Sequence, residues 1–164
     1  MPLGLLPAAR LDVDPADLAD PQEVAESFLH ALAAPDLERA LALVDEDITY
    51  VNVGLPTIRG RQRVAKVLGG LDRPGSSFEV YLHAVSADGP VVLTERTDVL
   101  VFGPLRIQFW VWGRFDVHDG QITLWRDSFD NLDIARGLVR GLFGIVLPVL
   151  RPKAPTRLDA APGR

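Results

Sequence analysis

The chain has 164 residues, of which 48% are hydrophobic and 24% charged, and its net charge is −5. This composition is typical of a soluble globular protein, and the length suits one domain that encloses a core and a ligand-sized cavity. The acidic balance, without any run of lysines and arginines, argues against nucleic acid as a partner.

The residue types also limit the chemistry. There is no cysteine, which excludes disulfides and thiolate catalysis. The three histidines, His30, His83 and His118, are far apart and show no ligand spacing, so we expect no metal and no cofactor. The N-terminal stretch has no basic region ahead of an apolar one, as an export signal would, and we therefore expect a cytoplasmic protein.

Helices are predicted in the first part of the chain. Asp20 and Pro21 predict a helix start, because aspartate is a good cap and proline suits the first helical position. Apolar residues then recur at helical spacing. A short second helix follows Pro35, and a third spans about residues 60–71. The side of the third helix that we expect in the core carries Val64, Val67, Leu68 and Leu71.

Strands dominate the remainder. Residues 47–54, DITYVNVG, alternate like a strand between the second and third helices. Turn signals such as Asp119-Gly120 separate further strands. These are predicted at roughly 77–86, 91–102, 105–118 and 121–129. Residues 132–147 predict a buried final helix that closes one end of a pocket; the apolar stretch there is shorter than the roughly 20 residues that span a bilayer.

Helices followed by a meander of strands predict an α+β fold with a curved, mixed or antiparallel sheet and helices packed over one face. We expect one domain over residues 20–150. A flexible N-terminal segment, 1–19, precedes it, and a disordered tail, 151–164, follows it.

Charged residues interrupt the apolar strand VVLTERTDVLVF, residues 91–102. Alternate side chains of a strand share a face. This places three sets of side chains together: Thr94, Arg96, Asp98, Leu100 and Phe102; Ile48, Tyr50 and Asn52; and Thr123, Trp125, Asp127 and Phe129. Each set mixes large apolar groups with a few polar ones, as small-molecule pockets do. The alternation alone slightly favours another interpretation, in which these faces are solvated and Arg96 and Asp98 form a surface pair worth roughly 0–1 kcal/mol.

Three motifs, YVN (50–52), TERTD (94–98) and WRDSFD (125–130), together resemble the limonene-1,2-epoxide hydrolase family, most closely its mycobacterial-type members. The resemblance covers roughly residues 20–148. It implies an NTF2-like cone, as in the SnoaL-like proteins, around a deep apolar pocket, and usually a homodimer without a cofactor. One departure is Ser128, where the family more often has an aromatic residue.

The resemblance also implies roles in opening an epoxide to a vicinal diol. Asp127 matches the base that activates water, Asp98 matches the acid, and Arg96 matches the residue that bridges the two carboxyl groups. Tyr50 and Asn52 match the residues that hold the water. Acid and base can act in one step, so no covalent intermediate is expected.

Apolar side chains would surround these groups and bind a lipophilic epoxide of terpenoid, sterol or fatty-acid type. The candidates are Leu29, Leu32, Leu71, Val80, Leu100, Phe109, Val111, Trp125 and Phe129, although any of them could equally be plain core. Phe109 and Trp110 alternate in direction, so one should face the cavity. An outer row with Trp110 and Trp112 would suit a dimer interface.

Two other functions stay open in this fold class, because a fold does not determine an activity. An enzyme like ketosteroid isomerase or a polyketide cyclase would set a carboxylate base and a tyrosine or protonated aspartate against an enolate, without needing the Arg96 bridge. A non-catalytic lipophile-binding protein would keep the apolar pocket without needing both aspartates.

Overall fold

The computed structural model describes residues 20–70, 73–147, 149, 151 and 153–155. The helices are α1 (Pro21–Ala33), α2 (Leu37–Ala42), α3 (Arg61–Leu68) and α4 (Asn131–Val146). The strands are β1 (Val44–Asn52), β2 (Ile58–Arg59), β3 (Ser76–Asp88), β4 (Val91–Phe102), β5 (Leu105–His118) and β6 (Gln121–Ser128). The N-terminal segment 1–19, most of the tail 151–164 and Leu71 lie outside the described residues.

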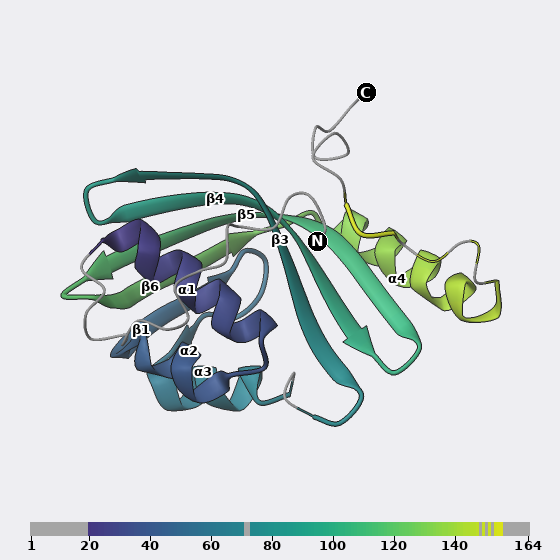
Figure 1. Cartoon of the computed structure of the whole chain (residues 1–164), viewed down its shortest axis with the longest axis horizontal. Coiled ribbons are helices and arrows are strands. Elements are labelled where there is room, and N and C mark those ends of the chain that lie inside the picture. Colours follow the sequence, from purple (N-terminus) through teal and green to yellow (C-terminus); the bar gives the residue numbers. More distant parts are fainter. Residues whose placement is uncertain (1–19, 71–72, 148, 150, 152, 156–164) are drawn as a thin grey trace.

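The six strands form one curved sheet in the order β2-β1-β6-β5-β4-β3. Strands β3 to β6 form an antiparallel meander, whereas β1 joins β6 in parallel, so the sheet is mixed. Figure 1 shows α1, α2 and α3 together on one side of this sheet. The predicted α+β fold with a curved, mixed sheet is confirmed.

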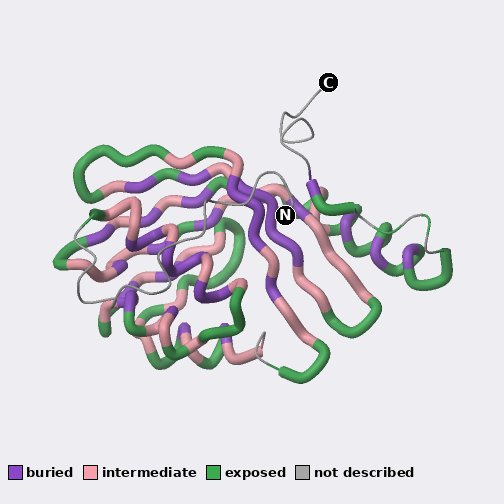
Figure 2. Tube along the Cα trace, in the orientation of Figure 1, coloured by how far each residue is buried: buried purple, intermediate pink, exposed green. Residues whose placement is uncertain are grey.

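Helix α1 forms as the sequence predicts. The Asp20 carboxylate accepts a hydrogen bond from the Gln22 amide at 2.8 Å, which satisfies a backbone donor at the helix start. Val24, Phe28 and Leu29 face the sheet and are fully buried. Burial of each such side chain stabilises the fold by roughly 1.5–3 kcal/mol. Figure 2 shows buried residues along α1 and along the strands of the sheet.

Helix α3 is shorter than predicted and begins after Gly60, whose positive φ of 86° favours glycine. Val64 and Leu68 are buried as predicted, but Val67 is 49% exposed, so its predicted place in the core is wrong. The reason is that α3 lies at the edge of the sheet, against β1 and the edge strand β2, and only a narrow side of it is covered.

Helix α4 lies away from the other helices and packs against β5 (Figure 1). Strand β6 pairs with β5 only as far as Ser128 opposite Trp112. Residues 105–111 of β5 therefore have no β6 partner on that side, and α4 covers this open edge. The Asp133 carboxylate accepts a hydrogen bond from the Trp110 backbone amide at 3.2 Å, which satisfies one donor of the edge.

Glycines make this contact between α4 and the strand possible. A Cβ at Gly137 would stand 2.6 Å from the Gln108 carbonyl oxygen, and a Cβ at Gly141 would stand 2.4 Å from that of Arg106. The large apolar side chains of α4 point elsewhere and are exposed, so the predicted burial of this helix is wrong: Leu138, Val139, Leu142, Phe143, Ile145 and Val146. None of the described helices is long and apolar enough to cross a membrane.

Candidate active site

The strand register brings the polar residues of three motifs together on the side of the sheet that faces α1. Asn52 is opposite Asp127 in the parallel pairing of β1 and β6. Asp127 is opposite Gly113 on β5, and Gly113 is opposite Thr94 on β4. Because side chains of paired residues lie on the same face, one row of positions crosses four strands.

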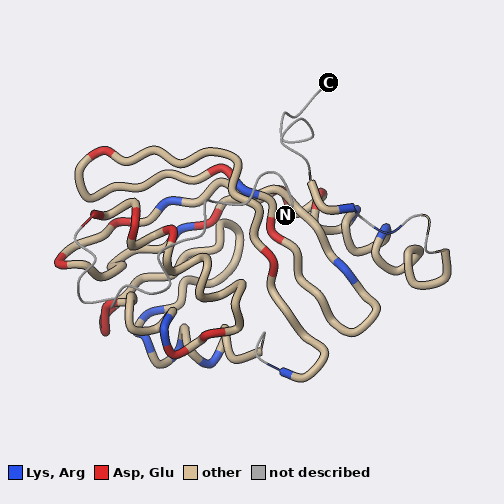
Figure 3. Tube along the Cα trace, viewed as in Figure 1, with Lys and Arg blue, Asp and Glu red and all other residues tan. Residues whose placement is uncertain are grey.

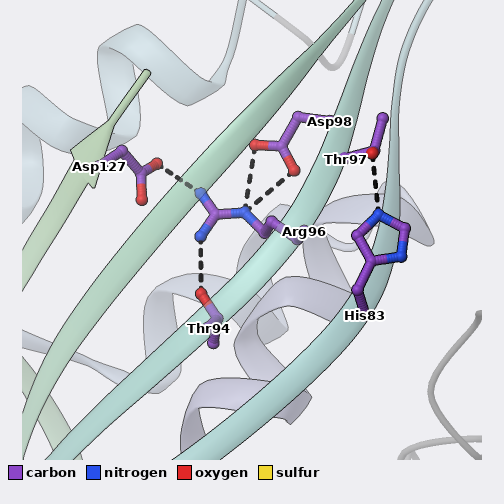
Figure 4. Close-up of polar contacts among 6 residues, drawn as sticks. All are labelled: His83, Thr94, Arg96, Thr97, Asp98 and Asp127. Carbon is purple, nitrogen blue, oxygen red and sulfur yellow. Dashed lines mark hydrogen bonds and ion pairs between the residues drawn. The ribbon is translucent and has the colours of Figure 1, made fainter. Parts of the chain in front are cut away.

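Arg96 is the centre of a buried polar cluster (Figure 4). Its Nε donates to both carboxylate oxygens of Asp98, at 3.0 and 3.2 Å. Its Nη2 forms an ion pair with Asp127 Oδ2 at 2.6 Å, and its Nη1 donates to the Thr94 hydroxyl at 3.1 Å. Arg96 is 0% exposed and the two aspartates are each 4% exposed. The solvated alternative for this face is therefore wrong.

The charges in this cluster depend on one another. Burial disfavours the guanidinium cation, but the carboxylates of Asp127 and Asp98 outweigh that effect and raise the pKa of Arg96. The Phe115 ring lies under the guanidinium, with 6.0 Å between Cζ and the ring centroid. Two carboxyl groups around one cation leave a site that is able to hold one extra proton. Figure 3 shows where Asp, Glu, Lys and Arg lie along the chain.

Asp98 is the member of the pair that is suited to hold this proton. Its pKa is raised from 3.8 to about 6: burial raises it most, Arg96 lowers it, and the negative charge of Asp127 raises it. Asp127 Oδ1 is buried and makes no hydrogen bond to the described residues, and it is thus able to accept a proton from a bound molecule. The two carboxyl groups therefore differ in environment, as an acid and a base must.

Tyr50 and Asn52 end β1 beside this pair. Tyr50 is 8% exposed and stacks on Trp125, with ring centroids 4.0 Å apart. Burial and the Asp127 charge raise the pKa of Tyr50, against the effect of its hydrogen bond with Asn52. The hydroxyl therefore stays protonated and is able to donate, while the Asn52 amide offers a donor and an acceptor opposite Asp127.

The predicted apolar residues surround the cluster to different degrees. Trp125 packs edge-on against Phe28, and Phe109 packs edge-on against Phe129. Leu100 and Phe129 are half-buried and Leu71 lies outside the described residues, while the other candidates are buried: Leu29, Leu32, Val80, Phe109, Val111 and Trp125. Their contact with a ligand stays a prediction.

The outer face of β5 carries the tryptophans, as the alternation predicts. Trp110 is half-buried and stacks on His83 at 4.8 Å between centroids, whereas Trp112 is 56% exposed. In the part of the chain that the structure describes, no group of three or more His, Asp or Glu side chains is arranged to hold a metal ion.

Two residues of the cluster were not among the predicted site residues: Thr94 and Gly113. Thr94 contacts Arg96 directly. A Cβ at Gly113 would stand 2.0 Å from Arg96 Nη1. The signal in the sequence was a glycine inside an otherwise apolar strand, which often marks the close approach of another group.

Comparisons with known proteins identify relatives of this chain. Residues 19–140 match the family model of the limonene-1,2-epoxide hydrolase catalytic domain. Epoxide hydrolase EphG of Mycobacterium tuberculosis (strain ATCC 25618 / H37Rv) is 51% identical over 127 residues, which cover 77% of this chain and 84% of EphG. A solved M. tuberculosis LEH-like epoxide hydrolase is 47% identical, with a TM-score of 0.78, over 82% of this chain and 95% of that chain.

More distant solved structures share the fold. A putative ketosteroid isomerase from Kribbella flavida DSM 17836 is 21% identical, with a TM-score of 0.57, over 68% of this chain and 78% of that chain. This likeness shows an NTF2-like fold, as predicted, but carries no activity with it. The family model covers residues 19–140, and each of the two epoxide hydrolases matches more than three quarters of the chain. The chain thus belongs to the limonene-1,2-epoxide hydrolase family.

Proposed function

We propose that the protein hydrolyses a lipophilic epoxide to a vicinal diol by direct attack of water. The observation that carries this proposal is the buried Arg96 guanidinium that contacts Asp98 and Asp127 together. Membership of an epoxide hydrolase family supports the same activity. Ring strain makes the epoxide reactive, but water is a weak nucleophile and an alkoxide is a poor leaving group. An acid and a base placed together address both problems.

The proposed reaction needs two proton transfers. Asp127 accepts a proton from water as the water oxygen bonds to one epoxide carbon. The bond between that carbon and the epoxide oxygen breaks, and Asp98 gives its proton to the oxygen. Asp127 then holds a proton and Asp98 is ionised, so the proton has to return to Asp98 before the next turnover. Each positioned acid or base is worth about 10²–10⁴ in rate.

Tyr50 and Asn52 are proposed to hold the water together with Asp127. Hydrogen bonds between the water and these three groups, with the Asp127 carboxylate as an acceptor, would fix the water so that a lone pair faces the epoxide carbon, which lowers the entropic part of the barrier. The buried apolar side chains Phe109, Val111 and Trp125 lie on the same face of the sheet and support a lipophilic substrate.

Enolate chemistry and passive lipophile binding are the rival functions. An isomerase or a cyclase would need a carboxylate base and a tyrosine or protonated aspartate but no bridging arginine, and a binding protein would not need both aspartates. Neither function explains an arginine that is fully buried between two carboxyl groups, since the desolvation of these ions costs several kcal/mol each. The contact therefore favours the hydrolase.

The activity is tested by incubating the protein with epoxides of increasing bulk and measuring diol formation, with a ketosteroid as the competing substrate. We expect diol from at least one lipophilic epoxide, and we expect Asp127→Asn to remove this turnover while retaining the fold. Conversion of the ketosteroid with every epoxide untouched would reject the proposal. Activity retained by both Asp127→Asn and Asp98→Asn would reject the proposed site.

We further propose that the protein is a homodimer. Trp112 and Leu93 lie on the outer face of neighbouring strands and are 56% and 53% exposed. Aromatic residues such as tryptophan are enriched at the centres of interfaces, and Leu93 adds apolar area beside Trp112. The exposed apolar side of α4 supports the same proposal. A cytoplasmic location stays a prediction from the sequence.

A further inference from the structure

The Thr94 hydroxyl accepts a hydrogen bond from the buried guanidinium of Arg96. Arg96 is 0% exposed, and its Nη1 donates to the Thr94 hydroxyl at 3.1 Å, on the side of the guanidinium away from Asp98. Thr94 itself is 2% exposed. Removal of this acceptor would leave a buried N–H without a partner, unless the guanidinium turned to find another. The hydroxyl therefore helps to set the plane of the guanidinium.

Gly113 leaves the space in which the guanidinium lies. It is opposite Thr94 on one side and opposite Asp127 on the other. A Cβ at this position would stand 2.0 Å from Arg96 Nη1, 2.4 Å from Thr94 Oγ1 and 3.2 Å from Asp127 Oδ1. These atoms belong to buried side chains that are held by a hydrogen bond between Thr94 and Arg96 and an ion pair between Arg96 and Asp127, so they have little freedom to move. The glycine is required here by the space that the guanidinium occupies.

We propose that Thr94 and Gly113 are positioning residues of the site, because together they fix the orientation in which Arg96 bridges Asp98 and Asp127. Neither contributes a reacting atom. The inference rests on the proposed function of the bridged pair. It adds that the geometry of the Arg96 bridge depends on the Thr94 hydroxyl on β4 and on the absence of a side chain at Gly113 on the neighbouring strand β5.

A threonine pair on one strand makes the test specific. Thr94 and Thr97 are both on β4 and nearly fully buried, at 2% and 4% exposed. Each hydroxyl has one side-chain partner: Thr94 contacts Arg96, whereas Thr97 contacts His83 at 2.9 Å on the opposite face of the sheet (Figure 4). Thr97→Val is therefore the matched control for Thr94→Val, since both remove a buried hydroxyl from the same strand.

The experiment measures kcat and KM for an epoxide that the wild type hydrolyses, from about pH 5 to pH 9, with unfolding midpoints for every variant. The charged and titratable groups that face Asp98 are Arg96 on its own strand, Asp127 on β6 and Tyr50 on β1. Thr94→Val should lower kcat about tenfold with little change in KM, which corresponds to a loss of about 1.4 kcal/mol of transition-state stabilisation when Arg96 is less well oriented. The alkaline limb of the pH–rate profile of Thr94→Val should move to higher pH. A loosely held guanidinium stabilises the Asp98 carboxylate less, so the pKa of Asp98 rises.

Thr94→Ser should restore both kcat and the pH profile, and Thr97→Val should match the wild type in both. Gly113→Ala should lower kcat by roughly 10² or more, because its Cβ displaces the guanidinium. A wild-type rate and pH profile in Thr94→Val would overturn the inference, even if Gly113→Ala fails to fold. So would equal losses in Thr94→Val, Thr94→Ser and Thr97→Val. Asp127→Asn separates the two proposals: if it abolishes turnover while Thr94→Val keeps the wild-type rate and pH profile, the proposed function stands and this inference fails.

Discussion

The Arg96 guanidinium on β4 reaches across the whole of β5 to lie 2.6 Å from Asp127 on β6. It is able to do so because the residue between them, Gly113, has no side chain. Asp98, on the same strand as Arg96, completes the bridge. Two aspartates that are 29 residues apart thus share one cation in the interior of the protein.

Removal of this cation should be costly for both stability and rate. In Arg96→Met, two buried carboxyl groups lose their partner, and breaking a buried pair costs about 3–5 kcal/mol. Arg96→Lys keeps the charge but lacks the fork that contacts two carboxylates, so it should recover part of the stability and remain roughly 10²-fold less active. Chemical denaturation and steady-state kinetics give the two results. A fully active Arg96→Lys enzyme would contradict a role that depends on bridging.

The rate should fall as the pH rises through the pKa of Asp98. Burial raises this pKa to about 6, and the proposed acid acts only while it is protonated. We therefore expect kcat/KM to fall about tenfold per pH unit well above pH 6. A pH profile measured with a neutral epoxide tests this. An activity that rises steadily from pH 6 to pH 9 would exclude Asp98 as the acid.

The free energy of unfolding should also fall as the pH rises through the pKa of Asp98. Because the pKa of Asp98 is raised from 3.8 to about 6 on folding, the folded protein holds this proton at pH values where the unfolded chain has released it. The stabilising effect is complete below about pH 3.8 and is lost as the pH rises to about 6, by an amount on the order of 3 kcal/mol. Asp98→Asn, which mimics the protonated acid, should remove this dependence. Denaturation curves at pH 4 and pH 8 that differ equally in both proteins would contradict it.

Tyr50 should affect turnover more than binding. Tyr50→Phe removes the hydroxyl but keeps the ring that stacks on Trp125, so the fold should be retained. If the hydroxyl holds the water, its loss should lower kcat about tenfold, equivalent to one hydrogen bond of about 1.4 kcal/mol, with KM little changed. Kinetic constants of the variant measure this split. A change confined to KM would indicate that Tyr50 contacts the substrate instead.

The outer face of the sheet should control the oligomeric state. Trp112→Glu places a charge at the centre of the proposed interface and should convert a dimer into a monomer in light scattering after gel filtration. Leu55→Glu is the control, because Leu55 is equally exposed, at 56%, but belongs to the loop between β1 and β2. A wild-type protein that is monomeric at all concentrations would exclude the dimer.

Much of the fold could be predicted from local patterns. Alternation and the Gly-containing turns predicted β3 to β6 to within two residues and β1 to within three, and the cap at Asp20 predicted the start of α1. Strand β2 could not be predicted, because two residues carry no period and become a strand only by pairing with Thr49 and Tyr50. The place of α4 was also hidden, since it depends on where β6 stops along β5.

The site was predictable to the extent that it depends on alternation. The pattern placed Arg96 with Asp98, and Tyr50 with Asn52, on shared faces. It could not show that these faces meet, because that depends on the parallel pairing of β1 with β6. Gly113 inside a strand indicates a close approach, but the sequence could not show which group approaches, because the guanidinium that fills its space comes from the neighbouring strand.

The central claim, that water attacks the epoxide directly beside the bridged aspartates, is tested most directly by a single turnover in oxygen-18 water with enzyme in excess over substrate. We predict that the label appears in the diol in this first turnover and that Asp98 and Asp127 remain unlabelled. Unlabelled diol from the first turnover, with oxygen-18 incorporated into either aspartate, would show that a carboxylate attacks the epoxide and would contradict the account.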